Sequence, residues 1–307
     1  MKKYMYSIVI FCLLIFMFVK PTEAVMASKT GVLLWSETII PTLLPFLILS
    51  GLIIQLDIVP IFTYFFAPIL SKILGLTRNG AYVFVIGFLC GYPMGAKIAS
   101  DMVTKKLITL NEGQYLLGFC NNVSPVFVIT YIIFTNLQRQ DLLFQTVLII
   151  YSAPLIFALL SQFSYRKNIT NEHFQPKKEV SQIQINFELV DTCIMNAFKS
   201  ITILGGYIVL FALITEIIYC LPIPNIFIKN ILAGIAELTY GIQTIAKSNI
   251  PFHFKYLLII GITTFGGLSS LAQTKSMIKQ SKLSLLPYIK AKIIITGISI
   301  LLALFLI

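Results

Sequence analysis

The chain has 307 residues, of which 57% are hydrophobic and only 11% are charged, and its formal net charge is +11. A mean hydropathy of +0.89 excludes an ordinary soluble domain, whose composition is far less apolar. The basic residues are spread over many short polar connections, which argues against a nucleic-acid partner and predicts an integral membrane protein in contact with the lipid bilayer.

The first predicted element is the apolar run of residues 4–19, which follows a basic start at Lys2 and Lys3. This run and the small-residue stretch TEAVMA after it are also typical of a signal peptide, cleaved after Ala24 or Ala27. A multispanning protein can instead keep its first helix as an anchor. We expect residues 1–30 to form an uncleaved membrane anchor helix, with cleavage as the alternative.

Further apolar runs near the roughly 20 residues that cross a bilayer follow along the chain. They cover residues 38–56, 80–100, 114–134, 142–161, 201–219, 226–246, 254–271 and 285–307. Residues 59–74 are also apolar but contain Pro60 and Pro68, so we expect a re-entrant or tilted piece there. The sequence therefore predicts an all-α polytopic membrane protein with about eight to ten membrane helices, some of them broken or re-entrant.

The stretch GFLCGYPMGAKIASDMV, residues 87–103, combines a packing pattern with a helix break. Small residues recur every four positions, at Gly87, Gly91, Gly95 and Ala99, as in close-packed membrane helices. Packing does not explain Tyr92 and Pro93, because proline frees a carbonyl and disfavours helical geometry at the preceding residue. Non-helical backbone at membrane depth occurs where protein or a water-filled cavity surrounds it. We therefore expect a substrate site at this break.

Lys97 follows about one turn after the break, and Asp101 lies four residues later on the same helix face. A lysine at this depth is costly enough to suggest a functional role. Its long side chain can also reach the membrane interface, which is the alternative. We include Lys97 in the predicted site, as a cation for an anionic substrate.

A second interruption lies in GFCNNVSPVFVITYIIF, where Asn121, Asn122, Ser124 and Pro125 fall in the middle of an apolar run. Such residues also bridge neighbouring membrane helices through hydrogen bonds. Because the two breaks occur as a pair, we expect the broken helices to face each other and to present polar groups to one substrate.

The second half repeats this pattern loosely. Residues 259–278 align with residues 85–103 when Gly266 is placed opposite Gly91, and matching interruptions in two halves are typical of transporters with inverted repeats. The predicted contribution of this half to substrate binding is Gly266, Gly267, Ser269, Ser270 and Gln273. We expect a first repeat at 31–162, a polar loop at 163–186 and a divergent second repeat at 187–307; the basic loop favours the cytoplasmic side.

No motif points to an enzyme, a metal site or a cofactor. The five cysteines stand singly, and the chain contains no paired histidine motif, serine nucleophile elbow or Walker lysine loop. We therefore expect no catalytic residues, no metal and no cofactor.

Three stretches resemble the sporulation integral membrane proteins of the YlbJ type, within the nucleoside-recognition or Gate domain group. They are LWSETIIPTLLPFLILSGLI, GYPMGAKIASDMV and LNEGQYLLGFCNNVSPVFVI, within residues 34–129. The resemblance implies a protein of endospore-forming bacteria, in the mother-cell membrane around the forespore. It also implies a role in moving dipicolinate, a small aromatic dicarboxylate, toward the developing spore. Cys90 departs from the small hydroxyl residue common at its position.

The residues and the resemblance together predict a transporter of a small organic anion. Helix amino-terminal ends and Lys97 would attract such an anion, and Tyr92 would stack on an aromatic ring. A nucleoside-like substrate is one alternative; a non-transporting sporulation component is another. A second copy of the chain and sporulation proteins are further partners that the sequence leaves open.

Overall fold

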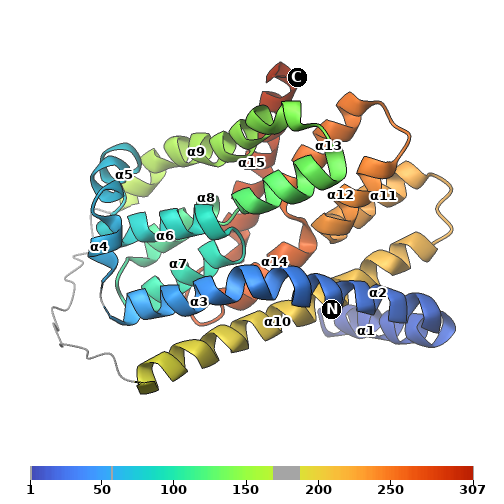
Figure 1. The fold of residues 1–307 in the computed structure, drawn as a ribbon, viewed down its shortest axis with the longest axis horizontal. Helices are drawn as coiled ribbons and strands as arrows, with labels where there is room; N and C mark the ends of the chain where they lie inside the picture. Colours follow the sequence, from blue (N-terminus) through green and yellow to red (C-terminus); the bar gives the residue numbers. More distant parts are fainter. Residues whose placement is uncertain (1, 57, 169–186, 307) are drawn as a thin grey trace.

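The structure is a computed structural model that describes residues 2–56, 58–168 and 187–306. Within these ranges every regular element is helical and there is no strand (Figure 1). By length and composition four helices can cross a membrane, or up to six if each of two bent pairs forms one span. The predicted all-α membrane fold is confirmed. The expected helix count is higher because several apolar runs fold as pairs of shorter helices.

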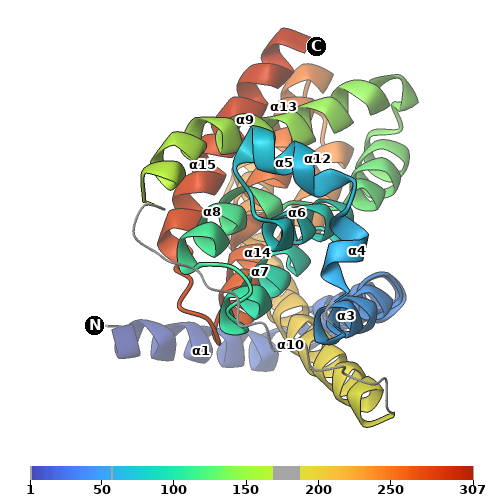
Figure 2. The same ribbon diagram turned by 90° about the vertical axis from the view of Figure 1, so that its left-hand side faces the viewer.

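The amino-terminal part consists of α1 (Lys2–Val19), α2 (Pro21–Leu33), the π-helical turn η1 (Leu34–Ile39) and α3 (Ile40–Gln55). The bent pair that meets at Lys20 has an angle of 114°, and beyond it the chain is helical as far as Gln55. Trp35 fixes this long segment by donating a hydrogen bond from Nε1 to the carbonyl of Ile201, at 2.9 Å. As a result α3 lies along the long helix α10 (Phe187–Cys220) (Figures 1 and 2).

The expected tilted piece at residues 59–74 is present as α4 (Val59–Thr63) and α5 (Phe66–Leu74). The axis of α5 makes an angle of 98° with that of α6 (Arg78–Cys90). Gly75, which has a positive φ of 69°, ends α5, and the Thr77 side chain caps the start of α6. Glu112 is fully buried and accepts hydrogen bonds from the Thr77 amide at 2.7 Å and hydroxyl at 3.0 Å.

The chain reverses after α6, and α7 (Met94–Thr104) packs back against it as a hairpin. Gly87 and Gly95 face each other across this hairpin, and a Cβ at either position would collide with the carbonyl of Cys120. The predicted small-residue seam therefore exists, but it lies between two antiparallel helices and not along one helix face. An interrupted helix follows, formed by α8 (Leu110–Cys120) and the π-helical η2 (Phe127–Leu137). After η3 (Gln140–Leu142) comes the long helix α9 (Leu143–Asn168).

The second half begins with the 34-residue helix α10 (Phe187–Cys220). The predicted single span at 226–246 is instead a second hairpin, formed by α11 (Ile226–Ala236) and α12 (Leu238–Lys247). Gly234 and Gly241 allow the two backbones of this hairpin to touch. The second interrupted helix consists of α13 (Phe252–Phe265) and α14 (Gly267–Met277), and α15 (Leu285–Leu306) is the last long helix.

The order hairpin, interrupted helix and long helix therefore occurs twice along the chain (Figure 1). The contacts cross between the halves, because α7 packs on α14 and α12 packs on η2. This order pairs the Gly91 hairpin with the α11–α12 hairpin, and the Asn121 break with the Gly266 break. That pairing differs from the sequence alignment, which set Gly266 opposite Gly91. The repeat boundaries stay a prediction, and most of the polar loop, including Lys177 and Lys178, lies outside the described residues.

Candidate substrate site

A cavity of about 630 Å³ lies where the tips of both hairpins and the breaks of both interrupted helices meet. Tyr92 and Pro93 line it from the first hairpin, and Glu237, Leu238 and Thr239 line it from the second. The interrupted helices contribute Val123, Ser124, Gly266, Ser269, Ser270 and Gln273. We call this space the break cavity. Helices α3 and α10 close one of its sides with apolar residues such as Phe46 and Leu204.

The tip of the first hairpin confirms the predicted helix break. Helix α6 ends at Cys90, Gly91 has a φ of +79°, and α7 begins at Met94. The amide of Tyr92 donates a hydrogen bond to the carbonyl of Asn122, which joins the two predicted breaks. The Tyr92 hydroxyl is buried and has no hydrogen-bond partner among the described residues. An unpaired polar atom beside a cavity is available to a ligand, because leaving it unpaired is costly.

The two asparagines of the second break are bonded inside the protein and do not line the cavity. Asn121 accepts a hydrogen bond from the Ala96 amide at 3.2 Å. Its own amide donates to the Thr274 and Tyr288 hydroxyls at 2.8 and 3.0 Å. Asn121 therefore connects α7, α14 and α15 at the break, which is the helix-bridging role given above as the alternative.

Lys292 on α15 contacts the second break through its side chain. Its side chain is 1% exposed, and Nζ donates to Oδ1 of Asn122 at 3.0 Å. No salt bridge involves it among the residues that the structure describes. This residue was missed in the sequence, although a lysine within the apolar run 285–307 is itself a sign of function.

The start of α14 presents backbone amides and hydroxyls to the cavity. Gly266 and Gly267 have positive φ angles of 88° and 75°, and no side chain caps the helix. Ser270 donates a hydrogen bond to the Gly267 carbonyl at 3.0 Å, and Gln273 Nε2 donates to the Ser269 hydroxyl at 3.1 Å. Uncapped amides at a helix amino terminus favour an anion.

Glu237 forms the tip of the second hairpin and is the acidic residue that lines the cavity. Its carboxylate caps α12 by accepting from the Tyr240 amide at 2.8 Å. Next to it, the Tyr131 hydroxyl donates to the Thr239 carbonyl at 2.8 Å and ties η2 to this tip. Within the described part of the chain no three His, Cys, Asp or Glu side chains gather as metal ligands would. In the sequence, Glu237 lies between Gly234 and Gly241 in an apolar run, and this pattern could have indicated the tip.

The predicted site residues divide into two groups. Those that line the break cavity are Tyr92, Pro93, Ser124, Gly266, Ser269, Ser270 and Gln273. Those placed elsewhere are Gly91, Gly95, Lys97, Asn121, Asn122, Pro125 and Gly267. The glycines and asparagines of the second group support the breaks by close packing and hydrogen bonds.

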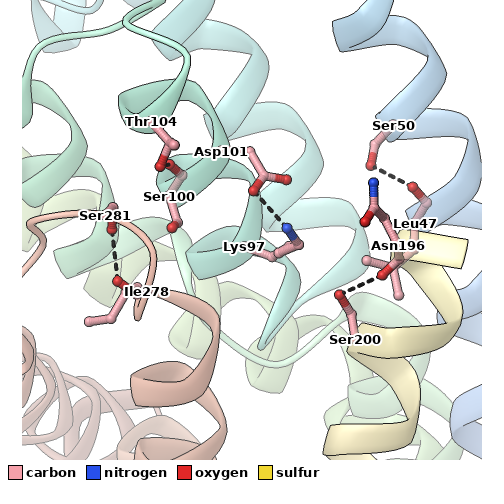
Figure 3. Close-up of polar contacts among 10 residues, drawn as sticks. All are labelled: Leu47, Ser50, Lys97, Ser100, Asp101, Thr104, Asn196, Ser200, Ile278 and Ser281. Carbon is pink, nitrogen blue, oxygen red and sulfur yellow. Dashed lines mark hydrogen bonds and ion pairs between the residues drawn. The ribbon is translucent and has the colours of Figure 1, made fainter. Parts of the chain in front are cut away.

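Lys97 belongs to a different cavity. Its ammonium pairs with Asp101 Oδ1 at 2.6 Å, as the four-residue spacing predicts, and points toward α3 and α10 (Figure 3). That cavity has a volume of about 580 Å³, and its lining includes Ser50, Asn196 and Ser200. The structure therefore separates Lys97 from the breaks that it follows in sequence.

The fold and the cavity define a helical integral membrane protein with paired hairpins and interrupted helices around a largely apolar cavity, to which the breaks add a few polar groups. A comparison with curated proteins finds the sporulation integral membrane protein YlbJ of Bacillus subtilis (strain 168), 22% identical over 308 residues. The match covers 89% of this chain and 75% of that protein. The predicted resemblance to the YlbJ-type sporulation membrane proteins is confirmed by this similarity. No family model matches the chain, and no solved structure matches it.

Proposed function

We propose that the protein transports a small organic anion across the membrane, with dipicolinate as the substrate and the mother-cell membrane around the forespore as its location. The observation that carries the proposal is the meeting of four helix interruptions at one cavity. Interrupted helices in a membrane protein supply polar backbone at a depth where regular helices cannot. YlbJ, the homologue, is described as a sporulation integral membrane protein.

Three features favour an anion in this cavity. The uncapped start of α14 supplies amides at its positive end. Lys292 adds a buried amino group, which donates a hydrogen bond, behind Asn122. The Tyr92 side chain at the first hairpin tip offers a ring and an unpaired hydroxyl, which suits an aromatic carboxylate.

The proposal is tested by the flux of labelled dipicolinate into proteoliposomes that contain the purified chain. Gln273→Leu keeps the side-chain volume but removes the amide that lines the cavity, so we expect flux to fall at least about tenfold. Lys275→Gln is the matched control, because Lys275 is an exposed residue of the same helix and lines neither cavity. Absence of flux in correctly inserted wild-type protein would favour a non-transporting role.

Glu237 favours a second candidate, a nucleoside-like solute whose hydroxyl groups would donate hydrogen bonds to the carboxylate. The variant Glu237→Gln separates the two. For a dicarboxylate it removes a repulsive charge, so binding should tighten or stay unchanged. For a nucleoside it removes a charged acceptor, and uridine flux should fall about tenfold or more.

A further inference from the structure

The cavity that contains Lys97 is basic, and we call it the basic cavity. Lys97, Lys105, Lys199 and Lys279 line it, and Asp101 is its one acidic lining residue in the described chain. Because Asp101 neutralises a single lysine, the lining keeps a positive excess. A recess lined by one sign of charge focuses the field and raises the local concentration of oppositely charged solutes.

The charges of the basic cavity are arranged by depth. Lys105, Lys199 and Lys279 are exposed, whereas the side chains of Lys97 and Asp101 are only 19% and 28% exposed. Buried hydroxyls of Ser50 and Ser200 line the same cavity. Figure 3 shows Lys97 and Asp101 on one side of this space, with Ser50, Asn196 and Ser200 on the other. A soluble anion would therefore meet exposed lysines first and the half-buried pair of Lys97 and Asp101 afterwards.

The basic cavity and the break cavity share three helices. Each is lined by residues of α3, α10 and α14, and α7 lines the basic cavity alone. Leu43 and Leu204 line the break cavity, Leu47 and Met277 line the basic cavity, and all four belong to one buried cluster. An apolar layer thus separates two cavities that follow one another along these helices.

The basic cavity lies toward the end of the molecule where α10 begins. Its lining includes Gln55 at the end of α3, Lys105 just after α7, and Cys193 and Asn196 near the start of α10. Helix α10 starts at Phe187, directly after the basic loop of residues 163–186. By the excess of positive charge this is the cytoplasmic end.

We propose that the basic cavity is a second binding site, which collects small dicarboxylates from the cytoplasm before they pass the apolar layer into the break cavity. This inference rests on the proposed function, and it assigns Lys97, Lys199 and Lys279 to capture of the anion. Asp101 holds the Lys97 ammonium in place, and an arriving carboxylate shares that ammonium with it.

The experiment measures binding and flux separately. Equilibrium dialysis of labelled dipicolinate against the full chain in nanodiscs of neutral phosphatidylcholine gives the affinity. Proteoliposome flux gives the half-saturating concentration and the maximal rate. The test variant is Lys97→Gln combined with Lys199→Gln, and Lys275→Gln is the control for loss of a lysine. We expect the half-saturating concentration of the double variant to rise at least about tenfold, with the maximal rate retained.

The outcomes distinguish the inference from the proposed function. If the wild type shows flux and the double variant has the same half-saturating concentration, the inference is overturned and the proposed transport function stands. Binding that needs Lys97 and Lys199, in a chain without flux, would support the basic cavity and contradict transport. Loss of dipicolinate binding when nanodiscs contain phosphatidylglycerol, with recovery in the absence of that lipid, would assign the cavity to a lipid headgroup and overturn the inference.

Discussion

Among single residues, Lys292 is the strongest indication of function. It is almost fully buried in a membrane helix and bonded to an amide oxygen at the junction of two breaks. Ionisable residues at such depth are costly and are kept for ion or substrate pathways. Its hydrogen bond to Asn122 also holds the α8 break against α15.

Lys292→Met keeps an unbranched side chain of similar length but removes the amino group and its hydrogen bond to Asn122. Leaving a buried hydrogen-bond partner such as Asn122 unsatisfied costs about 1–3 kcal/mol, so we expect dipicolinate flux to fall at least about tenfold. Lys290→Met is the control, since Lys290 is exposed two residues earlier on the same helix. Unchanged flux in Lys292→Met at equal insertion would show that Lys292 has no part in transport.

The polar residues show how far the sequence predicts a site. Both breaks predicted from the sequence are present, and half of the residues assigned to the substrate line the break cavity. Asn121 has a side chain of the kind that binds substrates, yet its amide group forms hydrogen bonds to residues of three helices. The direction of a side chain depends on how helices pack, and packing between distant segments is not encoded in local sequence.

At the scale of elements, both hairpins depend on glycines at their crossing points. A Cβ at Gly95 would meet the backbone of Cys120 and Asn121, and a Cβ at Gly241 would meet the backbone of Gly234. Backbone atoms cannot rotate out of the way as a side chain can. The hairpins can therefore pack as they do only with glycine at these positions.

Gly95→Ala should destabilise the protein by about 1–3 kcal/mol, as overpacking of a close contact does. Gly206→Ala is the matched control, because no atom lies within 4 Å of the added Cβ and alanine favours a helix by about 1 kcal/mol over glycine. Thermal unfolding in detergent should give a lower Tm for Gly95→Ala and an equal or higher Tm for Gly206→Ala. Equal Tm values for both variants would contradict the close packing.

The second hairpin shows why one element was missed. The first hairpin has a proline at its tip, and a proline within an apolar run indicates a helix break. The second turns at Glu237 without proline, and its helices α11 and α12 read as one continuous apolar run. Only the contact of Gly234 with Gly241, seven residues apart, reveals the reversal.

At the scale of the whole molecule, the two halves interlock around the break cavity. Helix α7 of the first half packs on α14 of the second, and α12 of the second packs on η2 of the first. Each wall of the cavity is therefore shared between halves, so relative motion of the halves would change access to it. The order of elements supports an internal repeat more clearly than the loose sequence match.

The most direct test of the central claim is counterflow in proteoliposomes loaded with unlabelled dipicolinate and diluted into a trace of labelled dipicolinate. A transporter with one substrate site accumulates the label transiently, and the account predicts this overshoot in wild type, its loss in Gln273→Leu and its persistence with excess uridine outside. Label that fails to accumulate in correctly inserted wild-type protein, or an overshoot unchanged in Gln273→Leu, would contradict the break cavity as the site of anion transport.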